Sequence, residues 1–275
     1  MSLLAEYEGE AKPLAGGQSL VPSMNFRLAQ PSILVDLNGI DDLAGMRFGS
    51  DGAVTVKAMT RQSAVEKDKR IAELAPALAE AMPYIAHPQI RNRGTIGGSL
   101  AHADPAAELP AVMVAMQASL VVESSGGRRT VKASDFFQGL FTTALEPGEL
   151  LVEVEIPALR PGEGTAFEEF ARRHGDYALA GAVARVRLGD DGKIAEASLV
   201  FFSIGDIPIE SASAYQVLQG ERPTPEAILA AAEASLADID PQGDIHATAP
   251  YRRHLAKVLA RHTLTRAAER AGRKT

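Results

Sequence analysis

The sequence contains no cysteine among its 275 residues. A disulfide framework, a thiolate nucleophile, a cysteine-ligated zinc and a cysteine-ligated iron–sulfur cluster are therefore excluded on this chain. It also lacks a long apolar run: the longest, residues 111–122, is interrupted by Gln117 and Ser119 and is too short for a transmembrane helix. Three glutamates among the first ten residues replace the basic start of a signal peptide. These absences predict a cytoplasmic protein.

The chain also has no excess of basic over acidic residues. The chain has 28 Lys and Arg against 35 Asp and Glu, which gives a net charge of −7 and disfavours nucleic-acid binding. The last helix expected, from Tyr251 to about Ala271, is the exception, because Tyr251–Thr275 holds eight basic residues and one acidic residue. Three interpretations stay open, in this order: a solvated helix face with basic residues near its C-terminal end, a docking surface for an acidic partner subunit, and a nucleic-acid contact.

The hydrophobic pattern mixes strands and helices. In the first part of the chain it predicts a buried strand at Ser32–Leu37, a loop at Asp41–Gly52, a strand at Ala53–Ala58, one helix from Ile71 to Met82, a hairpin of Ser119–Glu123 with Arg128–Lys132, and a half-solvated strand at Leu151–Ile156.

Pro157, Pro161, Gly162 and Gly164 cluster after that strand and form the best candidate domain boundary. The pattern beyond it predicts a solvated strand at Ala182–Leu188, a turn at Gly189–Gly192, a buried strand at Ile194–Ile204 and a helix capped by Thr224. We therefore expect domains at 1–160 and 165–275, since ~150 residues is an ordinary domain size.

Two glycine loops have the same form, with a Gly-Gly pair just before a serine. They are Ala15-Gly16-Gly17-Gln18-Ser19 and Thr95-Ile96-Gly97-Gly98-Ser99. Glycine lets a backbone approach a ligand closely, and successive N–H groups can then converge on one anion. Two such loops could clamp the two phosphates of a dinucleotide, although each alone could be a plain turn. Neither loop has a Walker A or a G-x-G-x-x-G pattern, which disfavours an NTPase or a Rossmann nicotinamide site.

Two further segments carry polar chemistry. His102 and Asp104 form a weak His-x-Asp metal pattern without a third ligand, and Asp104 also fits a cap or a sugar-hydroxyl acceptor. Arg172–Tyr177 predicts a tight bend at Gly175 that either presents an aromatic side chain or buries Tyr177.

The chain contains the segments AGGQSLVPSMNFRLAQPSILVDLN, IRNRGTIGGSLAHADPAAELPA and ARRHGDYALAGAVARV. In their order and spacing, these three segments resemble the FAD-binding medium subunits of molybdenum hydroxylases. The carbon monoxide dehydrogenase medium subunit group and the flavin domain of xanthine dehydrogenase are the similar families. The resemblance covers the chain from about Ala11 to the last helix. It implies a two-subdomain FAD-binding domain of the vanillyl-alcohol-oxidase (PCMH) type and a smaller C-terminal α+β domain.

The resemblance also implies where FAD binds. Both glycine loops would hold the pyrophosphate, Asp104 would accept hydrogen bonds from ribityl or ribose hydroxyls, and Tyr177 would lie against the isoalloxazine. Leu150 would touch the flavin or the adenine. The complete set implied is Ala15, Gly16, Gly17, Gln18, Ser19, Thr95, Ile96, Gly97, Gly98, Ser99, Asp104, Leu150 and Tyr177. No catalytic acid or base and no metal ligand is implied on this chain.

By the same resemblance, a large subunit would carry the molybdenum–pterin cofactor and a small subunit two [2Fe–2S] clusters, in a dimer of heterotrimers. This chain would accept electrons from the clusters and pass them to an external acceptor. The complex would have no transmembrane segment and could associate peripherally with a membrane. Two alternatives stay open: an assembly or structural subunit that no longer binds FAD, and a stand-alone FAD enzyme of the UDP-sugar reductase type.

The chain departs from the family pattern in four places. Members usually begin with about 20 more residues that form a strand and most of a helix, so Met1–Gly9 reads as the tail of that helix and as a shortened start. Ser99 stands where asparagine is common, and Gln18 stands where histidine is common. Glu168 and Glu169 lie where some relatives carry a lysine near the flavin.

Overall fold

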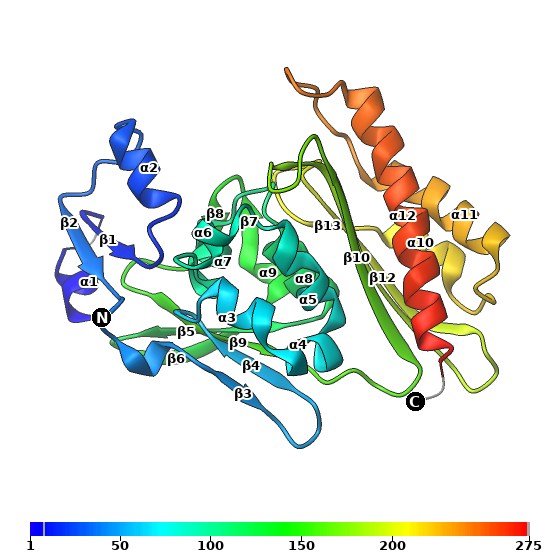
Figure 1. The fold of residues 1–275 in the computed structure, drawn as a ribbon, viewed down its shortest axis with the longest axis horizontal. Helices are drawn as coiled ribbons and strands as arrows, with labels where there is room; N and C mark the ends of the chain where they lie inside the picture. Colours follow the sequence, from blue (N-terminus) through cyan, green and yellow to red (C-terminus); the bar gives the residue numbers. More distant parts are fainter. Residues whose placement is uncertain (8, 274–275) are drawn as a thin grey trace.

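The computed structural model describes residues 1–7 and 9–273. Figure 1 shows an N-terminal part and a C-terminal part, each built on its own sheet. The outermost element of the N-terminal part is a pair of parallel strands, β1 (Ala11–Leu14) and β2 (Ile33–Asp36), with the short helices α1 (Ser2–Glu6) and α2 (Leu20–Asn25). The predicted buried strand here is β2, but its side chains alternate between partly buried and exposed, because β2 pairs only with β1.

A five-stranded antiparallel sheet with the order β3-β4-β9-β5-β6 forms the base of the N-terminal part. Its strands are β3 (Met46–Phe48), β4 (Val54–Lys57), β5 (Ser119–Ser124), β6 (Gly127–Lys132) and β9 (Leu150–Ile156). The predicted strand at Ala53–Ala58 and the predicted hairpin are confirmed as β4 and as β5–β6. The predicted loop at Asp41–Gly52 is wrong, since it contains η1 (Asp41–Leu43) and β3.

Short helices cover this sheet. They are α3 (Gln62–Lys67), α4 (Lys69–Leu74), α5 (Pro76–Ala81), η2 (Met82–Tyr84), α6 (Pro88–Arg91), α7 (Ile96–His102), α8 (Glu108–Ala115) and α9 (Ala133–Phe136), followed by the small hairpin β7 (Phe137–Gly139) and β8 (Thr142–Thr143). The single helix predicted from Ile71 to Met82 is broken at Ala75, which has φ −139° and ψ 63°. The physical reason is Pro76, whose ring disfavours helical backbone at the residue before it.

The C-terminal part is a four-stranded antiparallel sheet packed between two layers. Its strands are β10 (Glu163–Ala171), β11 (Ala178–Leu188), β12 (Ile194–Phe202) and β13 (Ile209–Glu210). One face packs on α5 and α8 of the N-terminal part, and the other packs on the long helix α12 (Ala249–Ala271) and on α10 (Ala212–Leu218). The remaining elements are α11 (Pro225–Ala234) and η3 (Ser235–Asp238). The predicted strand at Ile194–Ile204 and the predicted last helix are confirmed as β12 and α12.

The C-terminal sheet separates two hydrophobic cores, because alternate side chains of its strands point to opposite faces. Phe167, Val183 and Phe202 join the core of the N-terminal part. Their neighbours Ala166, Ala182, Ala184 and Phe201 join the core beneath α12. Because successive residues of a strand point to opposite faces, a strand with protein on both sides is buried throughout.

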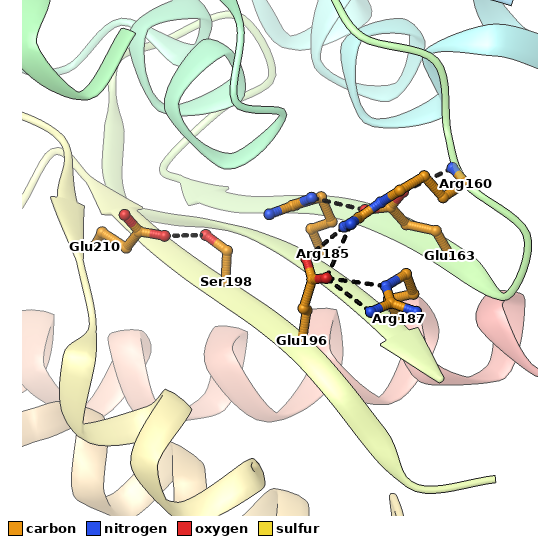
Figure 2. Close-up of polar contacts among 7 residues, drawn as sticks. All are labelled: Arg160, Glu163, Arg185, Arg187, Glu196, Ser198 and Glu210. Atoms are coloured by element: carbon orange, nitrogen blue, oxygen red, sulfur yellow. Dashed lines mark hydrogen bonds and ion pairs between the residues drawn. The ribbon is translucent and has the colours of Figure 1, made fainter. Parts of the chain in front are cut away.

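The solvated strand predicted at Ala182–Leu188 is therefore wrong in that respect, and the half-solvated strand predicted at Leu151–Ile156 keeps one exposed residue, Glu155. β11 is buried from Ala178 to Val186, and Figure 2 shows Arg185 turned toward Glu163, with an N–O distance of 2.7 Å. Strand β9 lies between β4 and β5, and its Glu153 is only 9% exposed and accepts a hydrogen bond from Arg47. Arg185 and Glu153 are thus matched by ion pairs within the protein, whereas Glu155 of β9 faces solvent.

Candidate FAD site

The two glycine loops lie against each other although 79 positions separate Gly16 from Thr95 in the chain. A Cβ added at Gly98 would lie 3.3 Å from the Cβ of Ala15, and one added at Gly16 would lie 2.8 Å from the Cα of Gly94. The first loop connects β1 to α2, and the second leads into α7. The absence of side chains at Gly16 and Gly98 is what lets the two backbones approach.

The first loop offers free donors. The backbone N–H groups of residues 16–19 make no hydrogen bond with any residue that the structure describes. Gly17 has φ +72°, a left-handed conformation that turns successive N–H groups toward one side. Gln18 folds back and donates its side-chain amide to the carbonyl of Gly16 at 2.9 Å. Free amides in a glycine turn are the donor set that an anionic phosphate requires.

The second loop uses its backbone differently. Gly97 donates to the carbonyl of Ala58 at 2.8 Å, Ile96 donates to that of Thr60 at 3.1 Å, and Gly98 donates to the Thr95 hydroxyl, which caps α7, at 3.0 Å. The amides of residues 96–98 are therefore satisfied within the protein. What this loop can still present is the Ser99 hydroxyl and the remaining hydrogen-bonding capacity of Thr95.

Arg61 and Asn38, which sequence reasoning missed, tie the two loops together. Arg61 donates to the carbonyl of Arg93 and, at 2.7 Å, to the side-chain oxygen of Asn38. Asn38 donates in turn to the carbonyl of Ala15 at 2.9 Å. Burial and the neighbouring positive charge of Arg93 lower the pKa of Arg61. Two guanidinium groups beside free amides make this corner attractive to a diphosphate.

Asp104 and Tyr177 meet although they come from different parts of the chain. Asp104 follows the left-handed residue Ala103 that ends α7 and accepts a hydrogen bond from the N–H of Ala106 at 2.9 Å. Desolvation, followed by the carboxyl groups of Asp104 and Glu108, raises the pKa of the Tyr177 phenol. Tyr177 remains 70% exposed, so the bend presents the aromatic side chain and the buried-tyrosine alternative is wrong.

The bend itself depends on Gly175, which has φ +85° and lies against His87 and Ala86. His102 packs against Phe141 with ring centroids 5.0 Å apart, and burial lowers the pKa of its imidazole. No group of three His, Cys, Asp or Glu side chains in the described ranges could hold a metal ion. Phe141 and Leu140 are about half exposed and add an apolar edge near α7 that sequence reasoning missed.

Leu150 lies beneath the first loop. It is 8% exposed and belongs to a small core cluster with Leu4, Leu37 and Met59, against which Ala15 packs. The structure thus brings Leu150, Ala15–Ser19 and Thr95–Ser99 into one region, with Asp104 and Tyr177 near the far end of α7. These residues fit FAD in one testable respect: the first loop has four free amides and lacks the Cβ atoms that would close it.

Residues 1–159 match the family described as "FAD binding domain in molybdopterin dehydrogenase", and residues 165–267 match the "CO dehydrogenase flavoprotein C-terminal domain". The 6-hydroxypseudooxynicotine dehydrogenase complex subunit alpha of Paenarthrobacter nicotinovorans is 43% identical over 98% of this chain and 91% of its own length. The carbon monoxide dehydrogenase medium chain of Afipia carboxidovorans is 40% identical over 98% of this chain and 93% of its own length.

A solved structure shows the same fold. Carbon monoxide dehydrogenase from Hydrogenophaga pseudoflava, in a form lacking the Mo-pyranopterin moiety, superposes with a TM-score of 0.93 and 38% sequence identity, over 98% of this chain and 93% of that chain. The fold is therefore an α+β FAD-binding domain followed by a C-terminal domain. The chain belongs to the oxidoreductase family of FAD-binding medium subunits of molybdenum hydroxylases, and it is similar to carbon monoxide dehydrogenase medium chains.

Proposed function

We propose that this chain is the electron-transfer subunit of a molybdenum hydroxylase, which accepts electrons from [2Fe–2S] clusters of a small partner subunit and passes them to an external acceptor. A large subunit would carry the molybdenum–pterin cofactor, and the assembly would be a cytoplasmic dimer of heterotrimers. The relatives named above are subunits of dehydrogenases. The cysteine-free sequence supports this division, because the clusters must then be held by another chain.

The single observation that carries the proposal is the contact between the two glycine loops beside four free amides. In this chain the amides of residues 16–19 would bind the pyrophosphate, with hydroxyls of Thr95 and Ser99 on the other side. Asp104 would orient sugar or ribityl hydroxyls, and Tyr177 would hold the flavin ring. Bound FAD would supply the ability to exchange electrons singly or in pairs. The domain limits that go with this function are 1–160 and 165–275.

The glycine loops are tested by substitution. Gly16→Val and Gly98→Val place a side chain where the loops touch, so we expect FAD affinity to fall by roughly ten- to a hundredfold. Gly39→Val is the matched control, because nothing lies within 4 Å of a Cβ at Gly39. The measurement is FAD titration followed by visible absorbance, with circular dichroism to show that each variant folds. Tight FAD binding by both loop variants would contradict the site.

Electron transfer is tested separately in the assembled complex. We expect the flavin absorbance of this chain to bleach when the partner subunits are reduced anaerobically, and to return on addition of an acceptor. An assembly in which this chain is colourless and takes up no FAD would favour the alternative of a structural subunit. Among the described residues, no helix combines the length and the apolar character that crossing a bilayer requires.

A further inference from the structure

Strand β10 sends two adjacent glutamates to opposite sides of the C-terminal sheet. Glu168 faces α12, where its carboxylate lies 3.0 Å from the ring of His262 and 3.5 Å from Arg266. Glu169 shares the opposite face with Phe167, whose ring packs against Tyr84 of the N-terminal part at 5.6 Å. Glu169 therefore points into the seam between the two parts of the chain.

Glu169 is buried there without a partner. Its side chain belongs to a residue that is only 8% exposed, and neither carboxylate oxygen has a hydrogen-bond partner among the described residues. In the sheet it pairs with Gly181, which pairs with Phe202, so β11 and β12 present only apolar atoms beside it. A buried carboxylate with no donor is costly, whereas a neutral carboxylic acid is tolerated.

The N-terminal part contributes a second buried carboxyl group, Glu108, whose charge acts on Glu169. Glu108 begins α8, is 7% exposed and lies four positions after Asp104. Helix α8 packs on β11 and β12, and the N–H of Ser203 at the end of β12 donates to the carbonyl of Pro105 at 2.9 Å. The seam between the parts and the loop that carries Asp104 are thus one connected structure.

Other ionisable groups near the seam already have partners of their own. Glu80 on α5 accepts hydrogen bonds from the N–H of Phe167 and from Arg270 and lies 3.0 Å from Arg266, so it is already neutralised. His174, on the β10–β11 loop, packs against Tyr84. On the cofactor side, the Asp104 carboxyl group acts on Glu108, and both carboxyl groups act on Tyr177. None of these groups offers Glu169 a counter-charge.

We propose that Glu169 and Glu108 form a proton-holding carboxyl pair behind the cofactor site, and that the chain binds FAD most tightly while both carboxyl groups keep their protons. The inference rests on the proposed function for the location of FAD. Both glutamates are positioning residues: they act through the Asp104 loop and through their charge. An ionised pair would add negative charge beside a site built for an anionic ligand.

The direction of the pH dependence follows from the burial of the pair. Burial, with repulsion from Glu108, raises the pKa of Glu169 to about 9. Burial also raises the pKa of Glu108 to about 7, with a further contribution from Asp104. Both groups hold protons in the folded chain that they lose in the unfolded chain. Their contribution to stability is therefore complete below about pH 4.5 and is lost as the pH rises toward 9.

The test is the Kd of FAD measured across pH with the full chain. For the wild type we expect Kd to rise in two steps, near the pKa of each glutamate, by about tenfold per step if FAD raises each pKa by about one unit. Glu169→Gln should remove the upper step, and Glu108→Gln the lower step. Glu168→Gln is the matched control, since this neighbouring glutamate faces α12, and it should keep both steps.

A structural role alone would not produce these profiles. If Glu169→Gln kept the upper step, or if the wild-type Kd did not change with pH, the coupling to FAD would be wrong. Urea unfolding of the FAD-free chain across the same pH range measures the effect of these protons on stability without the cofactor. The free energy of unfolding should fall less for Glu169→Gln than for the wild type as the pH rises. Failure to bind FAD at any pH would instead overturn the proposed function, and unfolding curves of wild type and Glu169→Gln that fell in parallel would overturn the buried pair.

Discussion

At the scale of single residues, Arg61 shows how one side chain can hold a binding loop. It reaches the carbonyl of Arg93, beside the second loop, and the side chain of Asn38, which holds Ala15 in the first. Neither Arg61 nor Asn38 belongs to a glycine motif. Their contribution is geometric, because they fix the separation of two backbones that a bound pyrophosphate would have to bridge.

We expect Arg61→Ala to weaken FAD binding by roughly tenfold, since the two hydrogen bonds that it removes are worth about 0.5–1.5 kcal/mol each. Arg61→Lys should weaken binding nearly as much, because an ammonium group keeps the charge but cannot span both partners. Titration with FAD measures both variants. Arg47→Ala removes an exposed arginine that pairs with Glu153 on the sheet and should leave the affinity unchanged. Full affinity in Arg61→Lys would mean that charge alone matters.

The glycine loops and the tyrosine bend could be predicted from the sequence because their signal is local. Gly17 and Gly175 adopt a left-handed backbone that glycine favours, and Gly16 and Gly98 leave room for a neighbouring backbone. The Arg61–Asn38 tie could not, since it joins residues 23 positions apart through side chains with no characteristic spacing. The buried Glu169 could not either, because its burial depends on a layer contributed by the other half of the chain.

At the scale of elements, the packing of α12 explains why the C-terminal segment is basic and why strands β10 and β11 are buried. Arg252 donates to the carbonyl of Leu179 and pairs with Asp244, Lys257 pairs with Glu233, and Arg270 binds Glu80. These cations serve contacts within the chain, so the expected plain solvated face is wrong for them. Docking of an acidic partner on the remaining basic residues stays a prediction, and Lys274 lies outside the described residues.

The same packing explains why the exposure predicted for strands β9 and β11 differs from the structure. Alternation predicts solvent-facing arginines in β11 and glutamates in β9. The structure instead buries Arg185 and Glu153 and pairs them with Glu163 at 2.7 Å and with Arg47 at 2.9 Å. Alternation reveals a strand correctly. It does not reveal what covers the strand, because the covering helices and the ion-pair partners come from distant segments.

We expect Gly164→Ala to destabilise the contact of β10 with α12 by about 1–3 kcal/mol. A Cβ at Gly164 would lie 2.5 Å from the N of Ala271 and 2.8 Å from the Cβ of Arg270, so helix and strand would have to separate. Urea unfolding monitored by circular dichroism measures the loss. Gly220→Ala is not a matched control because of its positive φ, whereas Gly39→Ala lies in open space at ordinary φ. Equal stability of Gly164→Ala and Gly39→Ala would show that α12 can move away from β10 without a measurable loss of stability.

At the scale of the whole molecule, the C-terminal sheet joins the two parts of the chain. One face completes the core of the FAD-binding domain and the other carries α12. Glu80 bridges all three layers, because it lies on α5, accepts from the backbone of β10 and binds Arg266 and Arg270 of α12. The two parts of the chain are therefore held together by charged contacts as well as by apolar packing.

We expect Glu80→Gln to loosen the seam, since hydrogen bonds to a charged group contribute about 1.5–3 kcal/mol each. The segment Pro157–Gly162, which joins β9 to β10, should then become more accessible, and limited proteolysis would cleave it faster. Glu73→Gln, an exposed glutamate on the preceding helix α4, is the matched control. Identical cleavage of the two variants would show that the apolar contacts alone hold the parts together.

The alternation along β10 also restricts how the gene for this protein can change in length. One inserted or deleted codon early in β10 would turn Glu168 toward the N-terminal part and Glu169 toward the arginines of α12, and it would pull Phe167 out of its contact with Tyr84. Two codons would restore every face. Descendants of this sequence should therefore vary in length at the connection before β10, while the strand itself should gain or lose residues only in pairs.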